Sequence, residues 1–230
     1  MTRTVALLPM KAHSERVSGK NFRHLGDRPL FRWILDTLLA VPAIDAVVIN
    51  TDARDMLAGH GLKDGFAGGR VIIRDRRPEI CGDLVSMNRI LVDDIAALAA
   101  DTYLMTHTTN PFLSAASITA ALAQYQRAVE SGEADSLFTV NRIQTRFYAG
   151  CGRPINHDPN NLIRTQDLEP WFEENSNLYI FSRNSFARTS ARIGRHPILF
   201  ESPALEAIDI DTPEQWCIAE ALALHWRGAR

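Results

Sequence analysis

The stretch Val5–Arg23, VALLPMKAHSERVSGKNFR, decides the fold of this chain. It opens with the apolar run Val5–Leu8, which is typical of a fully buried strand and stops at Pro9. The polar segment that follows carries four cationic side chains, Lys11, Arg16, Lys20 and Arg23. A buried strand that leads into a polar loop is how open α/β sheets build ligand sites at strand ends. Clustered cations favour an anion, most commonly a phosphate chain, although a charge run is also typical of a solvated basic loop.

The first loop contains neither of two familiar phosphate motifs. It has no GxxxxGK(S/T), so it is not a P-loop, and no GxGxxG, so it is not a dinucleotide fingerprint. Its only glycine is Gly19, directly before Lys20. We therefore expect side chains, with some help from backbone N–H groups, to hold the phosphates. Because exposed loop side chains contribute little to stability, we expect Lys20→Ala and Arg16→Ala to leave the fold nearly unchanged.

The composition is that of an ordinary globular protein. Of the 230 residues, 46% are hydrophobic and 23% are charged, which suits a single α/β domain. A formal net charge of −2 argues against nucleic acid as a partner. No apolar run approaches about 18 residues and the N-terminus resembles a strand, so we expect neither a membrane partner nor a signal peptide. The cysteines are odd in number, lack zinc spacing and indicate a cytoplasmic protein with reduced thiols: Cys81, Cys151 and Cys217.

Apolar runs and helical patterns alternate along the chain up to Val140. Strands are expected at 46–49, 70–74, 103–105 and 136–140, and helices from Pro29, over 87–98 and over 114–129. This alternation predicts an α/β fold with a mostly parallel twisted sheet and helices on both faces. The carboxyl ends of parallel strands meet at one edge of the sheet. The first loop and the polar segments 51–52, 75–83 and 106–110 are therefore expected to converge on one crevice.

The alternation breaks between about 142 and 202. This segment is rich in Arg, Asn, Pro and aromatic residues, and its clearest strand is Leu178–Phe181. We interpret it as an irregular insertion of short strands and loops within a single domain that spans 1–230.

Two carboxylates precede the last predicted helix. In a strand, Asp209 and Asp211 would share one face while Ile208 and Ile210 are buried on the other. Such a pair repels unless a cation lies between the carboxylates, and Mg²⁺ prefers oxygen ligands. The alternative is that Asp211 is an acid at a helix N-terminus. The helix itself begins with a capping box over 212–215, and its apolar side chains are expected to pack on the sheet.

The motif P-x-K-x-x-S-x-R-x-x-G-K-N at 9–21, together with I-D-I-D-T-P-E at 208–214, resembles a known family. It is similar to the cytidylyltransferases that activate acidic sugars, above all the acylneuraminate cytidylyltransferase (CMP-sialic acid synthetase) family. CMP-Kdo synthetase is a more distant relative. The family carries arginine at the position of Lys11 and a Gly-Gly-Ser run where this chain has His13-Ser14-Glu15, which indicates a divergent branch. The resemblance covers nearly the whole chain.

The resemblance implies a Rossmann-like, nucleotide-diphospho-sugar transferase-like fold and a Mg²⁺-dependent enzyme. Its substrates would be CTP and an acidic 2-keto sugar, and part of the insertion would form a homodimer contact and cover the sugar site. The implied catalytic residues are Lys11, Arg16, Lys20 and Asp211, with Asp209 and Asp211 as metal ligands. The implied nucleotide or sugar contacts are Ser14, Asn21, Arg77, Ser86, Thr109 and Asn110. Among these, Arg77 and Ser86 would read the cytosine ring.

Simpler interpretations stay open for several of these residues. Arg77 is also consistent with a surface arginine, Ser86 with a helix cap and Asn21 with a turn residue after Gly19. His107, which stands where the family has glutamine, is consistent with a polar surface residue. At the level of the whole protein, the alternatives are a nucleotidyltransferase for a Kdo-like or other sugar and a nucleotide-binding protein without turnover.

Overall fold

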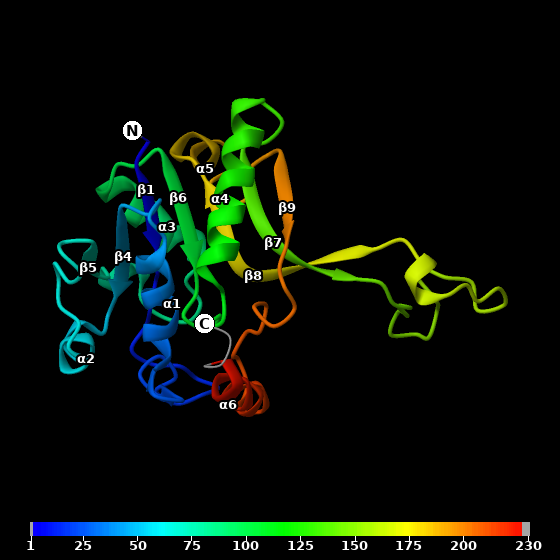
Figure 1. Cartoon of the computed structure of the whole chain (residues 1–230), viewed down its shortest axis with the longest axis horizontal. Helices are drawn as coiled ribbons and strands as arrows, with labels where there is room; N and C mark the ends of the chain where they lie inside the picture. The colour runs from blue at the N-terminus through cyan, green and yellow to red at the C-terminus, as the bar shows by residue number, and fades with distance from the viewer. Residues whose placement is uncertain (1, 227–230) are drawn as a thin grey trace.

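The computed structural model describes residues 2–226, which form a twisted sheet with helices on both faces and an arm that extends from one end (Figure 1). Within that range the main sheet has seven strands in the order β5-β4-β1-β6-β8-β7-β9. Only β8 runs antiparallel to its neighbours among them. The strands are β1 (Thr4–Leu7), β4 (Ala46–Thr51), β5 (Val71–Asp75), β6 (Thr102–Thr106), β7 (Ser136–Ile143), β8 (Trp171–Phe181) and β9 (Pro197–Glu201). The predicted α/β fold with a mostly parallel sheet is confirmed.

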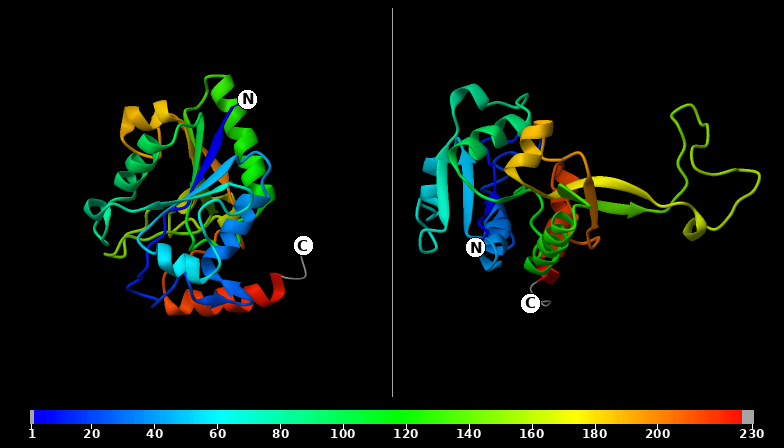
Figure 2. Two further views of the ribbon diagram at one scale, coloured as in Figure 1. Left: turned by 90° about the vertical axis from the view of Figure 1, so that its left-hand side faces the viewer. Right: turned by 90° about the horizontal axis from the view of Figure 1, so that it is seen from above.

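Helices cover both faces of the sheet, so the strands bury apolar side chains on both sides. On β1, Ala6 packs with α1 (Leu30–Ala40) and α4 (Ala115–Glu130), while Val5 and Leu7 pack with α3 (Met87–Ala97). This alternation follows from the two-residue period of a strand. The shorter elements are β2 (His24–Leu25), β3 (Arg28–Pro29), α2 (Arg54–Gly59), α5 (Arg183–Thr189) and the 3₁₀ turns Pro78–Ile80 and Thr165–Asp167. Figure 2 shows the helices on the two sides of the sheet.

The irregular insertion expected over about 142–202 is narrower in the structure. Trp171–Phe181 is an eleven-residue strand inside the main sheet, and Arg183–Thr189 and Pro197–Glu201 also belong to the body. The first half of β8 was not predicted because the sequence Glu173–Asn177 is polar, and Glu and Asn are depleted in strands. The arm visible in Figures 1 and 2 consists of 144–170 and the paired ends of β7 and β8 that lead into it.

The capping box of α6 (Pro213–Trp226) is confirmed. The Gln215 side chain accepts from the backbone N–H of Thr212 at 2.8 Å, and the Gln215 N–H donates to Thr212 Oγ1 at 3.3 Å. The helix does not pack on the main sheet as expected. Trp216 and Ala219 instead pack with Val17 of the first loop and with the start of α1. Helix α6 therefore packs against the first loop.

The strand expected over 208–211 is absent: these residues have no strand partner within 2–226. The Ile210 N–H donates to the Thr109 carbonyl at 2.9 Å and Asn110 Nδ2 donates to the Ile208 carbonyl at 3.5 Å, so the segment is tied to the loop after β6 by separate bonds rather than by a ladder. The prediction failed because the alternating pattern also fits an extended connection that buries only Ile210. Among the described residues, no helix is long and apolar enough to cross a membrane.

Candidate active site

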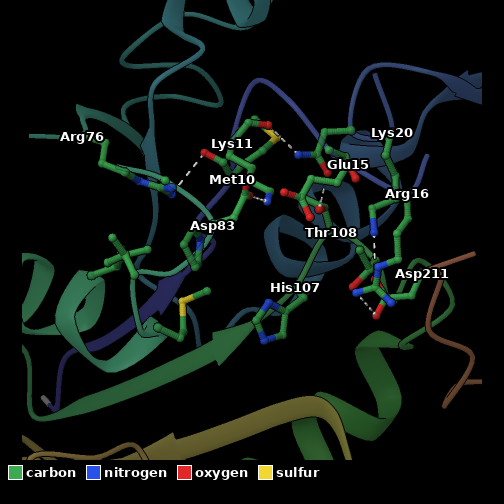
Figure 3. Close-up of a pocket in the computed structure, with 18 residues that line it drawn as sticks. Met10, Lys11, Glu15, Arg16, Lys20, Arg76, Asp83, His107, Thr108 and Asp211 are labelled. Carbon is green, nitrogen blue, oxygen red and sulfur yellow. Dashed lines mark hydrogen bonds and ion pairs between the residues drawn. The ribbon is translucent and has the colours of Figure 1, made fainter. Parts of the chain in front are cut away.

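A cavity of about 320 Å³ lies beyond the carboxyl ends of β1 and β6 (Figure 3). It is lined by the first loop, the loop after β5, the start of α3, the loop after β6 and Asp211. The predicted convergence is therefore found for the first loop and the segments 75–83 and 106–110, whereas Thr51 and Asp52 do not line the cavity. Its ionisable lining residues are Lys11, Glu15, Arg16, Lys20, Arg76, Asp83, His107 and Asp211. The cations outnumber the acids, which suits a polyanionic ligand.

Lys20 forms the most buried ionic contact of the cavity. Its Nζ donates to the Ile210 carbonyl at 2.6 Å and to Asp211 Oδ1 at 3.0 Å, while Arg16 Nη2 lies 3.2 Å from Asp211 Oδ2. Burial acts to raise the pKa of Asp211. The hydrogen bond and charge of Lys20, with the charge of Arg16, outweigh burial and lower the pKa below its usual range. Asp211 is thus held ionised between two cations.

The expectation that the loop cations are all exposed is wrong for Lys20. Lys20 is only 7% exposed, whereas the Arg16 side chain is 64% exposed. Arg23, the fourth cation of the loop, does not line the cavity. Its guanidinium lies 4.2 Å from the Trp216 ring centroid and 3.7 Å from Glu220, so it helps attach α6 to the first loop.

Lys11 bridges the first loop to the loop after β5 by pairing with Asp83. The hydrogen bond from Lys11 lowers the pKa of Asp83 below its usual range. Both side chains are substantially exposed, so this pair contributes little to stability. It places the Lys11 ammonium at the mouth of the cavity, where an anionic ligand can replace Asp83 as its partner.

Arg76, rather than the predicted Arg77, lines the cavity. Arg76 Nε donates to Asn50 Oδ1 at 3.0 Å, and its Nη2 donates to the Asn50 carbonyl at 2.8 Å and the Met10 carbonyl at 3.2 Å. Burial lowers the pKa of Arg76 below its ordinary value. Arg77 points to solvent and pairs with Asp93 at 2.9 Å. Neighbouring residues at a strand end face opposite ways, so the sequence Arg76-Arg77 left the choice open.

The Asn50 side chain is itself held in place by a hydrogen bond to Asp94. Its Nδ2 donates to Asp94 Oδ1 at 2.8 Å, and Asp94 is fully buried and pairs with Arg74. Burial raises the pKa of Asp94, against the opposing effects of Asn50 and Arg74. This network orients Asn50 so that its amide oxygen faces Arg76. No sequence motif pointed to it.

The remaining predicted contacts divide into three groups. Ser14 and Thr109 line the cavity, as expected. Asn21 also lines it, but its Nδ2 donates to the Lys11 carbonyl at 2.8 Å and its Oδ1 accepts from Thr108 at 2.6 Å, so Asn21 organises the loop. Asn110 is fully buried and Ser86 lines a neighbouring cavity, so neither reaches this one.

His107 faces the cavity from the end of β6 (Figure 3). Removal from bulk water lowers the pKa of its imidazole to about 3, and the positive charge of Arg192 adds to this effect. The ring is therefore neutral near pH 7 and acts as a hydrogen-bonding group. The alternative of a polar surface residue is not what the structure shows.

Asp209 and Asp211 do not line one cavity. Asp209 faces a second hollow of about 400 Å³ with Glu173, Asn175 and Gln215. Burial raises the pKa of Asp209, and the Asp211 charge adds to this while a hydrogen bond to Thr109 opposes it. Its Oδ1 is buried without a partner in the described part of the chain. An orphaned carboxylate oxygen next to a second carboxylate fits a hard cation.

No cluster of three His, Cys, Asp or Glu residues suited to a metal occurs within the described residues. This still fits Mg²⁺, since proteins commonly bind that ion through one or two carboxylates and the phosphates of a substrate. Of the two predicted ligands, Asp211 lines the candidate active site and Asp209 faces the other hollow.

The fold matches solved structures of nucleotidyltransferases. CMP:2-keto-3-deoxy-manno-octonic acid synthetase complexed with CTP aligns with a TM-score of 0.67 and 15% identity over 98% of this chain and 100% of that one. A 4-diphosphocytidyl-2C-methyl-D-erythritol synthase from Anaerococcus prevotii gives 0.67 and 12% over 97% and 99% of the two chains. At these identities the likeness shows the fold, and the cation-lined cavity lies at the strand ends, where such α/β folds bind ligands.

The chain belongs to the cytidylyltransferase family, whose model matches residues 5–225. CMP-N,N'-diacetyllegionaminic acid synthase of Legionella pneumophila is 24% identical over 234 residues, which cover 96% of each protein. N-acylneuraminate cytidylyltransferase of Oncorhynchus mykiss is 25% identical over 229 residues, and the match covers 96% of this chain and 50% of that relative. The family resemblance noted in the first loop is confirmed.

Replacing Lys20 with Met keeps its apolar stem but removes its ammonium. Because the Ile210 carbonyl and Asp211 then lose a buried donor, we expect a loss of about 1–3 kcal/mol in the free energy of unfolding. The exposed control Arg16→Ala should change it by no more than about 0.5 kcal/mol. Urea unfolding of both variants measures the difference, and equal losses would show that Lys20 has no special structural role.

His107 should make the protein less stable in mild acid. Its pKa falls from 6.5 to about 3 on folding, so the unfolded chain binds a proton in this window that the folded chain does not. Stability is therefore lost as the pH falls below about 6.5. Between about pH 7 and about pH 5, the melting temperature of His107→Gln should fall less than that of the wild type. The exposed control His13→Gln should follow the wild type; an identical fall in all three proteins would contradict the assignment.

Proposed function

We propose that the protein transfers CMP from CTP to the anomeric hydroxyl of an acidic 2-keto sugar and releases pyrophosphate. Family membership supports a cytidylyltransferase, and the relatives with a named acidic sugar support this class of acceptor. The observation that carries the proposal is the gathering of Lys11, Arg16, Lys20 and Arg76 around one cavity at the strand ends.

The reaction is an in-line displacement at the α-phosphorus. The sugar hydroxyl oxygen forms the new P–O bond, pyrophosphate leaves and the hydroxyl proton passes to solvent or buffer. Negative charge grows on the α-phosphate and the leaving group, and Lys11, Arg16 and Lys20 stabilise it. Removal of one well-placed donor of this kind typically costs about 10²–10³ in rate. His107 is neutral near pH 7, with one ring N–H and one ring nitrogen acceptor, and with a pKa of about 3 it is too weak a base to take a proton from the sugar, so it positions substrate by hydrogen bonding.

Mg²⁺ is the proposed metal, with Asp209 and Asp211 as its protein ligands. When bound, the ion would polarise the phosphate and neutralise its charge. The two residues differ in the free protein: Asp211 is already compensated by Lys20 and Arg16, whereas Asp209 has an unsatisfied oxygen. Asp209 is therefore expected to contribute more of the metal affinity.

The proposed activity is tested by measuring pyrophosphate release from each of the four ribonucleoside triphosphates with Mg²⁺. The acceptor panel contains N,N'-diacetyllegionaminic acid, N-acetylneuraminic acid and 2-keto-3-deoxy-manno-octonic acid. We expect release with CTP and at least one of the first two. Release only with the octonic acid would support the Kdo-like alternative, and no release with any acceptor would exclude the proposed activity.

Arg76, rather than Arg77, should determine the recognition of the nucleotide. We place the cytosine ring against Arg76 because its guanidinium lines the cavity while that of Arg77 is bound to Asp93 at the surface. Arg76→Met should raise the KM for CTP about tenfold or more, since a charged hydrogen-bond donor is lost. Arg77→Met is the matched control and should change it by less than about threefold. The reverse order in steady-state kinetics would restore Arg77 as the nucleotide contact.

Asp209→Asn should weaken the response to Mg²⁺ while leaving the fold intact. The substitution keeps the size of the side chain and removes a carboxylate whose ionisation is already disfavoured by burial, so the melting temperature without metal should not fall. The Mg²⁺ concentration for half-maximal activity should rise about tenfold or more. Asp211→Asn should also lower the melting temperature, because it leaves Lys20 without its carboxylate. An unshifted Mg²⁺ curve in both variants would remove the metal from this site.

We also propose a homodimer formed through the arm. Large apolar side chains lie exposed on the arm and at its base, which is typical of an interaction surface: Tyr148, Ile155, Leu162, Ile163, Trp171 and Phe172. A second copy of the same arm offers a self-complementary partner for such a surface.

Leu162→Asp places a charge within this apolar surface and should produce monomers. Leu224→Asp, on the exposed side of α6 away from the arm, is the control and should leave the dimer intact. Light scattering coupled to gel filtration measures the mass of each protein. A wild-type monomer, or an unchanged dimer in Leu162→Asp, would contradict the proposal.

A further inference from the structure

A half-buried arginine, Arg192, faces a second cavity beside the candidate active site. This cavity is distinct from the hollow that Asp209 faces. This cavity has a volume of about 330 Å³ and is lined by Ser86, Met87, Asn88, Glu174, Ala191, Arg192 and Ile193. Met87 also lines the first cavity, so the two hollows adjoin. Arg192 lies in the connection between α5 and β9, and its side chain is 19% exposed.

The guanidinium of Arg192 is incompletely compensated. It lies 3.9 Å from the Tyr179 ring centroid, and its Nη2 donates to the Tyr179 hydroxyl at 2.9 Å. Its Nη1 contacts the Met105 sulfur at 3.9 Å, which is a weak acceptor. The nearest carboxylate, Glu174, is 3.6 Å from Nη2 and already accepts from Tyr179. Within residues 2–226, Nε has no hydrogen-bond acceptor, so donors remain free for an incoming anion.

The backbone around Arg192 is held closely against the body. The Arg192 N–H donates to Asn88 Oδ1 at 3.3 Å, and the Gly194 N–H donates to Ser136 Oγ at 2.8 Å. A Cβ at Gly194 would lie 2.1 Å from Asp135 Oδ1, so only glycine allows this approach. The stacking of Arg192 on Tyr179 adds to this rigidity, and a rigid donor loses less entropy when it binds a ligand.

We propose that Arg192 binds the carboxylate of the acidic sugar, which occupies the second cavity while its anomeric hydroxyl reaches into the first. The inference rests on the proposed function and names the protein group that recognises its acceptor. The planar guanidinium matches a carboxylate in two parallel hydrogen bonds. A phosphate of CTP is the less suitable occupant, because Lys11, Arg16 and Lys20 already serve the first cavity and Arg192 does not line it.

The charge of Arg192 also affects a residue of the first cavity. After burial, the charge of Arg192 contributes most to the lowered pKa of His107, which lines the first cavity. Among the arginines of the expected insertion, Arg146 and Arg164 lie on the arm and bond within it.

The test is a double-mutant cycle between protein and substrate. Wild type, Arg192→Met and Arg192→Lys are assayed with N-acetylneuraminic acid, or whichever acid of the panel the wild type uses best, and with its C1 carboxamide. In the wild type, the change from acid to amide should lower kcat/KM about tenfold or more, because a charged hydrogen bond is lost. In Arg192→Met the acid and the amide should differ by less than about threefold. The Lys variant should lie between.

The KM for CTP separates this role from a structural one and should stay within about twofold of wild type in both variants. Arg195→Met, an exposed arginine in the same connection, is the matched control and should retain the full preference for the acid. If Arg192→Met keeps the wild-type preference, or loses activity together with CTP affinity, the carboxylate assignment is wrong while the proposed function stands. If the wild type releases no pyrophosphate with any acid, both the carboxylate assignment and the proposed function are wrong.

Discussion

The contact of Lys20 with Ile210 and Asp211 is the interaction on which the rest of the site depends. It joins the first loop to the segment before α6, although the two are 190 residues apart in the chain. Asp211 also pairs with Arg16, and its backbone N–H donates to the side chain of the capping residue Gln215. Without this contact, the first loop would lose the buried bond that holds Lys20 beside Asp211 at the cavity.

The cations of the first loop that line the cavity pair with carboxylates of the chain itself. Each main cation of the first loop has a carboxylate partner in the free protein, Asp83 for Lys11 and Asp211 for Arg16 and Lys20. A triphosphate can therefore replace or join these partners without a large rearrangement of the loop, which favours binding and transition-state stabilisation. The exposed Lys11 and Arg16 can exchange partners easily, whereas Lys20 is fixed. Lys20 thus has a structural part, and we propose a catalytic part in addition.

Sequence reasoning succeeded where local pattern determines structure. The apolar runs and helical spacings predicted β1, β4, β5 and β6 with the helices α1 and α3, because strands buried on both faces read as continuous apolar segments. The short helix α2 was not predicted. The first loop was correctly placed at the sheet edge for the same reason. The capping box of α6 is likewise local, since Thr212 and Gln215 contact each other within one turn.

The errors arose where distant residues decide the outcome. The choice between Arg76 and Arg77 depends on Asn50 and Asp93, which no local pattern reveals. The burial of Lys20 depends on Ile210, and Arg192 was missed because its surroundings, Tyr179 and Glu174, come from β8. The polar first half of β8 was missed since its pairing with β7, rather than its own composition, makes it a strand.

The most direct measurement of how this cavity is used is a crystal structure of the protein with CTP and Mg²⁺. We expect the triphosphate to contact Lys11, Arg16 and Lys20, with Lys11 released from Asp83, and the cytosine ring to lie on the side of Arg76. Lys20 should keep its bond to the Ile210 carbonyl. A triphosphate bound outside this cavity, or bound with all three side chains in their ligand-free pairs, would contradict the assignment of the first loop as the phosphate site.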